Sequence, residues 1–276
     1  MIMESGIIKI NGDKKFEIDE SVDIISTYTV NTWQERRSFE DKRKDTTLGK
    51  RAELIFQSYC EENLKNISYI SYDLFRKNNY KKHSPFDGLI YNPVNLSQED
   101  LNKYIEIINN QVSTDTYGKI NDDIKRELIQ NNIYIVEIKS TRITARHIIN
   151  ENINLGKILH DDFLTYPKYL RFDKNDSICN WNDYYNYCKK NRGFKGELTD
   201  LKKEEKNNMS DIYIRIYLKE DFTEAYIIGW ISKEKFIESA NIKKMSQMGK
   251  SEKALYLATS LINGDNVNVL NTLYGE

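Results

Sequence analysis

Short apolar runs alternate with stretches of helical periodicity along most of the chain. Residues 67–72, 87–91 and 133–140 are short runs rich in isoleucine and tyrosine, which predicts three β-strands. Between residues 211 and 218 isoleucine or leucine occupies every second position, and residues 225–231 provide a hairpin partner. The pattern indicates a central sheet in which the 133–140 strand is apolar enough to be buried on both faces.

Helical periodicity flanks these strands. Apolar side chains recur at the spacing of one helix face between residues 52 and 59, which predicts a helix over residues 47–63. A helix-rich segment is expected at about 155–170. A shorter helix is expected at 233–240, where Ser232 is a suitable N-cap residue. The predicted order is therefore helix, three strands, helix and further strands.

A long segment separates the second and third strands. Residues 92–131 contain two stretches of helical periodicity, and the run from Ser97 to Asp100 is typical of a helix N-terminus. We therefore expect a helical insertion between the second and third core strands. The insertion either covers the functional site as a lid or specificity element, or packs on the core as a peripheral helical hairpin. The sequence leaves both alternatives open.

The ends of the chain are expected to lie outside a core of residues 47–240. Residues 1–46 begin with a β element, in which Asn11 and Gly12 indicate a hairpin turn. A basic segment follows, with Arg36, Arg37, Lys42 and Arg43. This segment is either a solvated helix face or a contact for the phosphate groups of a nucleic acid. Residues 241–276 are expected to form a helical extension.

The amino-acid composition favours a folded, non-secreted protein without a strong overall positive charge. A hydrophobic content of 39% in 276 residues is sufficient for a folded core, and the net charge of −1 gives no global basic field. Any contact with DNA must therefore come from local patches. The three cysteines are odd in number and lack zinc-site spacing, which favours a reducing compartment. Residues 1–6 lack the features of a secretion signal, and no apolar run reaches membrane-spanning length. A cytoplasmic protein without a membrane partner is expected.

Candidate chemistry lies at the end of the 133–140 strand. Side chains alternate along a strand, so Glu137 and Lys139 project from the same face, while Asp87 begins the preceding strand. Charged groups at the end of a buried strand are costly unless they pair or serve a metal site. Two carboxylates can hold a divalent cation through oxygen ligands, and a lysine can sit beside an attacking water.

Asp87 followed by Glu137-Ile138-Lys139 resembles the motif of the PD-(D/E)xK nuclease superfamily. Pro85 stands one residue earlier than is usual in that motif, with Phe86 between it and the aspartate. The resemblance implies an α/β protein with a restriction-endonuclease-like core, in which a mixed central sheet is flanked by helices in αβββαβ order. It also implies that Asp87, Glu137 and the backbone carbonyl of Ile138 bind Mg²⁺, for which Mn²⁺ can substitute.

The same resemblance implies two catalytic roles. Lys139 would orient the attacking water and stabilise negative charge on the phosphate. Glu53, on the helix before the first strand, would complete the metal site directly or through water. An alternative for Glu53 is an ordinary surface glutamate early in a helix, where negative charge suits the helix dipole. The implied activity is metal-dependent hydrolysis of phosphodiester bonds in DNA, by an endonuclease of restriction, phage or repair type.

Two other classes of function stay open at this point. The chain is alternatively a non-catalytic nucleic-acid-binding or structural subunit with a nuclease fold, although the presence of Asp87, Glu137 and Lys139 together argues against this. It is alternatively a nuclease that acts on RNA. DNA is the expected partner, and the sequence leaves a homodimer open.

Overall fold

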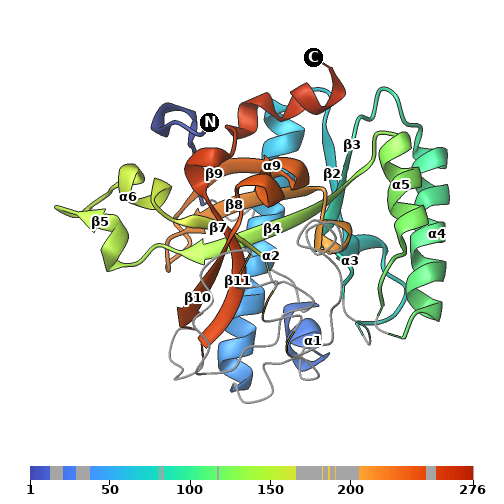
Figure 1. Cartoon of the computed structure of the whole chain (residues 1–276), viewed down its shortest axis with the longest axis horizontal. Coiled ribbons are helices and arrows are strands. Elements are labelled where there is room, and N and C mark those ends of the chain that lie inside the picture. Colours follow the sequence, from blue (N-terminus) through green and yellow to red (C-terminus); the bar gives the residue numbers. More distant parts are fainter. Residues whose placement is uncertain are drawn as a thin grey trace.

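The computed structural model describes residues 1–12, 21–28, 38–80, 82, 84–116, 118–165, 182, 186, 190, 205–246 and 253–275. Within these residues the protein is an α/β structure with a mixed, curled central sheet flanked by helices (Figure 1). The sheet order is β1-β9-β8-β4-β3-β2. Its strands are β1 (Ile8–Asn11), β2 (Ser68–Ser71), β3 (Gly88–Tyr91), β4 (Tyr134–Arg142), β8 (Ile212–Leu218) and β9 (Glu224–Ser232).

The sheet is mixed because β4 pairs in opposite senses on its two sides. β2, β3 and β4 form an antiparallel meander, whereas β8 runs parallel to β4. β9 returns antiparallel to β8, as the alternating pattern predicted. The three predicted core strands and the hairpin are therefore confirmed. β1 pairs with β9, and the expected hairpin partner of β1 at residues 15–18 lies outside the described residues.

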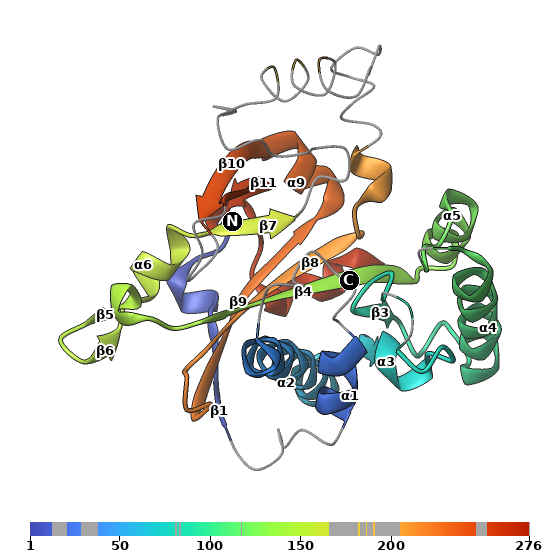
Figure 2. The same ribbon diagram turned by 90° about the horizontal axis from the view of Figure 1, so that it is seen from below.

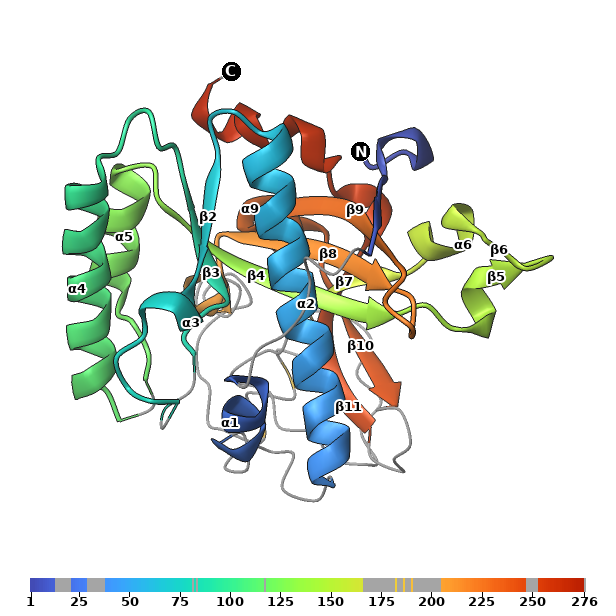
Figure 3. The ribbon, with the colours of Figure 1, turned by 180° about the vertical axis from the view of Figure 1, so that it is seen from behind.

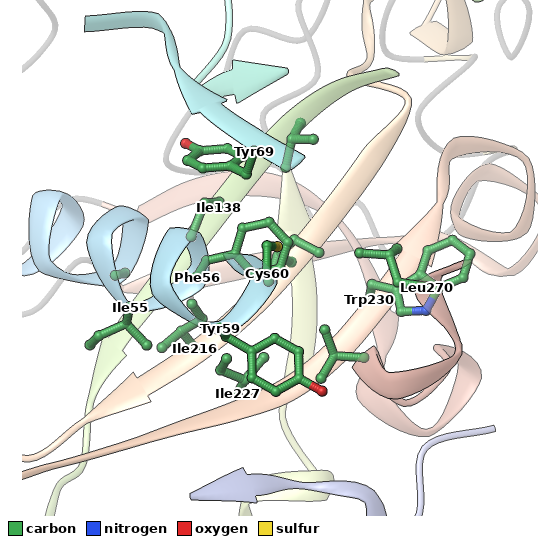
Figure 4. Close-up of a cluster of buried hydrophobic side chains, with 14 of the residues drawn as sticks. Ile55, Phe56, Tyr59, Cys60, Tyr69, Ile138, Ile216, Ile227, Trp230 and Leu270 are labelled. Carbon is green, nitrogen blue, oxygen red and sulfur yellow. The ribbon is translucent and has the colours of Figure 1, made fainter. Parts of the chain in front are cut away.

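Helix α2 (Phe39–Asn63) covers one face of the sheet (Figure 3). It begins eight residues before the predicted start at residue 47, because the Ser38 side chain accepts a hydrogen bond from the Asp41 amide and caps the helix there. The predicted apolar stripe is buried, and Phe56 packs at its centre against side chains of the sheet (Figure 4). The stripe fixes which side of α2 faces the strands.

A second, smaller sheet lies on the opposite face of the central sheet from α2, together with helix α9 (Lys233–Ser239) (Figure 2). Its strands are β7 (Asp162–Thr165), β10 (Asn241–Ser246) and β11 (Lys253–Ser260). Two expectations are corrected here. Residues 241–276 are not simply helical, because β10 and β11 precede two 3-10 helices, η5 (Leu261–Asn263) and η6 (Val267–Tyr274).

The second correction concerns residues 155–170. Helix α6 (Leu155–Leu159) is followed at once by β7, and residues 166–170 lie outside the described part of the chain. β7 forms because β11, far along the chain, pairs with it antiparallel. α9 was predicted correctly, since Ser232 caps it by accepting a hydrogen bond from the Lys235 amide.

The insertion between β3 and β4 is helical, as expected. Helices α4 (Gln98–Thr114) and α5 (Asp122–Gln130) lie beside each other next to the β2–β3 end of the sheet (Figure 1). Their buried side chains join those of β3, β4 and the short helix α3 (Tyr72–Phe75) in one cluster. The remaining elements are η1 (Glu4–Gly6), α1 (Ser21–Tyr28), η4 (Ala145–His147), β5 (Ile148–Ile149) and β6 (Asn152–Ile153). No helix within the described residues is long and apolar enough to cross a membrane.

Candidate active site at the ends of strands β3 and β4

Asp87 is held against β4 by both its backbone and its side chain. Its amide donates to the Val136 carbonyl at 3.1 Å, and its Oδ2 accepts the Ile138 amide at 2.7 Å. Its own carbonyl accepts from the Tyr72 amide at 2.9 Å and from the Tyr69 hydroxyl at 3.2 Å. Four hydrogen bonds therefore fix the position of this carboxylate at the start of β3.

The residue after Asp87 has to be a glycine for the strands to approach each other. A methyl group at Gly88 would come within 2.4 Å of the Tyr69 ring and within 2.6 Å of the Ile70 carbonyl oxygen. Gly88 therefore lets the Tyr69 ring lie across the strand and reach the Asp87 carbonyl.

Glu137 and Lys139 lie together on the face of β4 that points away from α2, as alternation predicted. The Lys139 ammonium forms an ion pair with Oε1 of Glu137, and the Ser210 hydroxyl lies 3.5 Å from Oε2. About a quarter of the Glu137 side chain and a third of the Lys139 side chain are exposed. Val136 and Ile138 point to the other face and pack beneath α2. The two charged groups therefore reach solvent from the middle of β4, beyond its apolar first half.

Glu53 is buried and fully engaged, so the interpretation as a surface glutamate is wrong. Its Oε2 accepts from the Ser71 hydroxyl at 2.6 Å, and its Oε1 pairs with the Lys50 ammonium at 2.6 Å. Lys50 also forms an ion pair with Asp73, which in turn pairs with Arg76 at 2.7 Å. Glu53 thus belongs to a network of alternating charges beside the start of β3.

Burial and neighbouring charges shift the pKa values of Asp87, Glu53 and Lys139. Burial, followed by the charges of Glu137 and Glu53, raises the pKa of Asp87 well above its usual range. Burial also raises the pKa of Glu53, although Lys50 opposes the change. Burial alone would lower the pKa of Lys139, but Glu137 and Asp87 outweigh it and raise that pKa. Lys139 is therefore a permanent cation at neutral pH, beside carboxylates that are costly to ionise together.

The ligand set is limited to oxygen atoms and to few side chains. Among the described residues, no group of three or more His, Cys, Asp or Glu side chains is arranged to hold a metal ion. Any cation at Asp87 and Glu137 would therefore need backbone oxygen or water to complete its coordination.

A pocket of about 510 Å³ opens in front of Glu137 and Lys139. Tyr213 of β8 forms part of its floor, and the loop before Asp87 contributes Phe86. The insertion contributes residues between Gly118 and Lys125. The helices of the insertion pack on the core, and its 118–125 segment forms a wall of the pocket. A role as a lid or specificity element stays a prediction.

The described residues of the basic segment do not line this pocket. Arg36 and Arg37 lie outside the described residues. Lys42 is only 5% exposed on α2, and Arg43 forms an ion pair with Asp23 of α1. Neither Lys42 nor Arg43 lines the pocket. Of the described residues of this segment, Lys42 is therefore buried, while Arg43 stays exposed in its ion pair with Asp23. A contact of this segment with phosphate groups stays a prediction.

Sequence analysis missed a second cation beside Lys139. Arg215 of β8 is the register partner of Lys139 across the parallel pair, and it is only 6% exposed. Its Nη2 donates to the Thr141 hydroxyl at 2.7 Å, and its Nε has no hydrogen-bond partner among the described residues. The sequence did carry a signal, because Arg215 is the one charged side chain inside a strand whose every other position is apolar or aromatic.

Comparison with known proteins identifies no relative. No protein family, curated protein or solved structure matches this chain. The fold and site define an α/β protein with a cluster of carboxylates and lysines at one end of a mixed sheet, and the likeness to the PD-(D/E)xK superfamily rests on the sequence motif.

Proposed function

We propose that the protein is a metal-dependent nuclease that hydrolyses phosphodiester bonds in DNA. The observation that carries the proposal is the hydrogen bond from the Ile138 amide to the Asp87 carboxylate, which brings the two halves of the D…ExK motif together. Glu137 and Lys139 then stand on either side of Ile138 and face a pocket. The antiparallel β2-β3-β4 meander with parallel β8 agrees with the restriction-endonuclease-like core that the resemblance implies.

The donor set suits a hard divalent cation such as Mg²⁺ or Mn²⁺. Burial, followed by the charges of Glu137 and Glu53, raises the pKa of Asp87, and a bound cation would favour its ionised form. Asp87 and Glu137 are the side-chain ligands that we assign. In an extended strand the N–H and C=O of one residue point to the same side. The Ile138 carbonyl would therefore join the Asp87 carboxylate as a third oxygen ligand. The bound cation would supply positive charge at the scissile phosphate and lower the pKa of a water molecule.

We assign different roles to Lys139 and Glu53. Lys139 is held by Glu137 at the pocket wall, where a protonated amine stabilises negative charge that develops on a phosphate oxygen. Glu53 is neutralised by Lys50 and fixed by Ser71, so we assign it a supporting role through water rather than a direct ligand bond. Lys50 also limits the repulsion that Asp87 experiences.

The test is cleavage of labelled DNA by the whole chain with and without Mg²⁺. Asp87→Asn should abolish Mg²⁺-dependent cleavage while it leaves the fold intact, because it removes charge from an oxygen site and keeps an acceptor for the Ile138 amide. Asp123→Asn is a matched control, since Asp123 is an exposed carboxylate that pairs with Arg126 on α5. Wild-type activity in Asp87→Asn would remove Asp87 from the site. If RNA is cleaved in preference to DNA, the substrate class in this proposal is wrong, while the metal-dependent hydrolysis of phosphodiester bonds still stands.

A further inference from the structure

The pocket beside Glu137 and Lys139 is larger than hydrolysis of a phosphate requires. Its volume of about 510 Å³ lies within the range of sites that enclose a small organic molecule. Much of its wall is apolar, with Phe86, Ile120, Met209 and Tyr213 all at most 8% exposed. Apolar and aromatic walls of this kind accept a flat ring system.

The charges that line the pocket balance. Three lysines and three acidic residues contribute to its wall: Lys119, Lys125, Lys139, Asp122, Glu137 and Glu205. An anion-binding pocket would carry an excess of cations, as phosphate sites do. This pocket is therefore suited to an uncharged group with polar edges.

Glu137 and Lys139 set the orientation of whatever occupies the pocket. Both side chains belong to the pocket wall, so a phosphate bound at Lys139 has its attached sugar and base next to the remaining volume. A base within a duplex is stacked and paired, and it cannot enter a pocket of this kind unless it leaves the stack.

We infer that this pocket receives the base and sugar of one nucleotide adjacent to the scissile phosphate, so that the substrate is a strand with an unpaired nucleotide. The part of this inference that concerns the substrate strand rests on the proposed nuclease activity. Its first test measures binding alone and needs no cleavage. Uncharged nucleosides should bind the pocket without any metal ion, because base and sugar are the parts that it recognises.

The first experiment titrates thymidine and adenosine into the whole chain without metal and follows chemical shifts or heat. We expect saturable binding with a dissociation constant in about the millimolar range, as suits a ligand of this size. Ile120→Trp and Met209→Trp each fill the pocket from a different wall, and each should weaken binding by about tenfold or more. Ile129→Trp is the control, because Ile129 lies on α5 at an exposed position that does not line the pocket.

The second experiment compares cleavage of single-stranded DNA, fully paired duplex and duplex with one unpaired nucleotide, all in Mg²⁺. We expect cleavage of the first and third in preference to the second, and loss of that cleavage in the two pocket-filling variants. Should the chain cleave paired duplex as fast as single strands and bind no nucleoside, the pocket inference is overturned while nuclease activity stands. If nucleosides bind, the tryptophan variants abolish that binding and the chain cleaves no substrate, the inference about the pocket is supported and the nuclease proposal is refuted.

Discussion

Lys139→Ala separates a catalytic lysine from one that only completes an ion pair. In the structure Lys139 is a half-buried cation at the pocket wall whose ammonium pairs with Glu137. Removal of a single electrostatic group from a catalytic site typically slows turnover by about a hundredfold, or about 2.7 kcal/mol of transition-state stabilisation. We expect a loss of that size in single-turnover cleavage, with DNA binding in Ca²⁺ preserved.

The expected cost in stability is smaller. A third of the Lys139 side chain is exposed, so the ion pair is partly solvated and its loss should cost about 1–2 kcal/mol. For a chain of this size that corresponds to a fall in melting temperature of about 2–8 °C. A domain that keeps several kcal/mol of stability is more than about 99% folded at 25 °C, so unfolding does not explain a hundredfold loss of rate.

Two further variants sharpen the assay. Lys139→Arg keeps the positive charge and should restore the melting temperature, but it should restore the rate poorly because a planar guanidinium places its donors differently. Lys103→Ala is the matched control, since Lys103 forms ion pairs with Glu99 and Asp100 on the exposed face of α4. A near wild-type rate in Lys139→Ala, together with a lower melting temperature, would refute the catalytic role and leave Lys139 as an ion-pair partner alone.

Three further predictions follow from the surroundings of individual side chains. Ca²⁺ should raise the melting temperature of the wild-type protein but not that of Asp87→Asn, because a ligand that binds only the folded state stabilises it; an equal rise in both would place the ion elsewhere. Burial, with Arg146 nearby, lowers the pKa of His147 despite the Asp161 carboxylate. As the pH falls, this histidine therefore takes up a proton in the unfolded state before it does so in the folded state, and the free energy of unfolding should decrease as the pH drops through about 6.5. In urea unfolding at several pH values, His147→Gln should make the free energy of unfolding depend less on pH. Phe56 is fully buried on the face of α2 that packs on the sheet, and it meets the Tyr69 ring edge-on with the ring centroids 5.3 Å apart. Phe56→Ala should therefore cost about 3–5 kcal/mol in urea unfolding, and a loss below about 1 kcal/mol would contradict this packing.

Local pattern was sufficient for the elements whose partners are close in sequence or whose apolar face is continuous. β2, β3, β4, the β8–β9 hairpin and α4 were all predicted, because alternation or helical spacing fixes their buried side whatever they pack against. β7 was missed for the opposite reason. It is a short strand that pairs, within the described residues, with β11 far along the chain, and no short-range signal indicates that pairing. β10 and β11 are neighbours in sequence, and they were missed because residues 241–276 were expected to be helical.

The candidate site was predictable in part for the same reason. Alternation placed Glu137 and Lys139 on one face, and helical spacing placed Glu53 on α2, where Lys50 pairs with it one turn away. The other partners come from elsewhere in the chain, because Ser71 and Ser210 reach the carboxylates only after the strands and helices pack. The pocket could not be predicted from the sequence, because its walls come from the insertion, the loop before Asp87 and residues 205–213 together.

Arg215 shows what the parallel pairing of β4 and β8 adds to the electrostatics. Register places Arg215 beside Lys139, and its positive charge opposes the effect of Glu137 on the pKa of that lysine. No carboxylate among the described residues forms an ion pair with Arg215, although its side chain is almost fully buried. Its guanidinium is held instead by the Thr141 hydroxyl and by the ring of Tyr217, whose centroid lies 5.2 Å away. The parallel pairing thus sets two cations from strands far apart in sequence side by side, and Lys139 is the one of the two that pairs with Glu137.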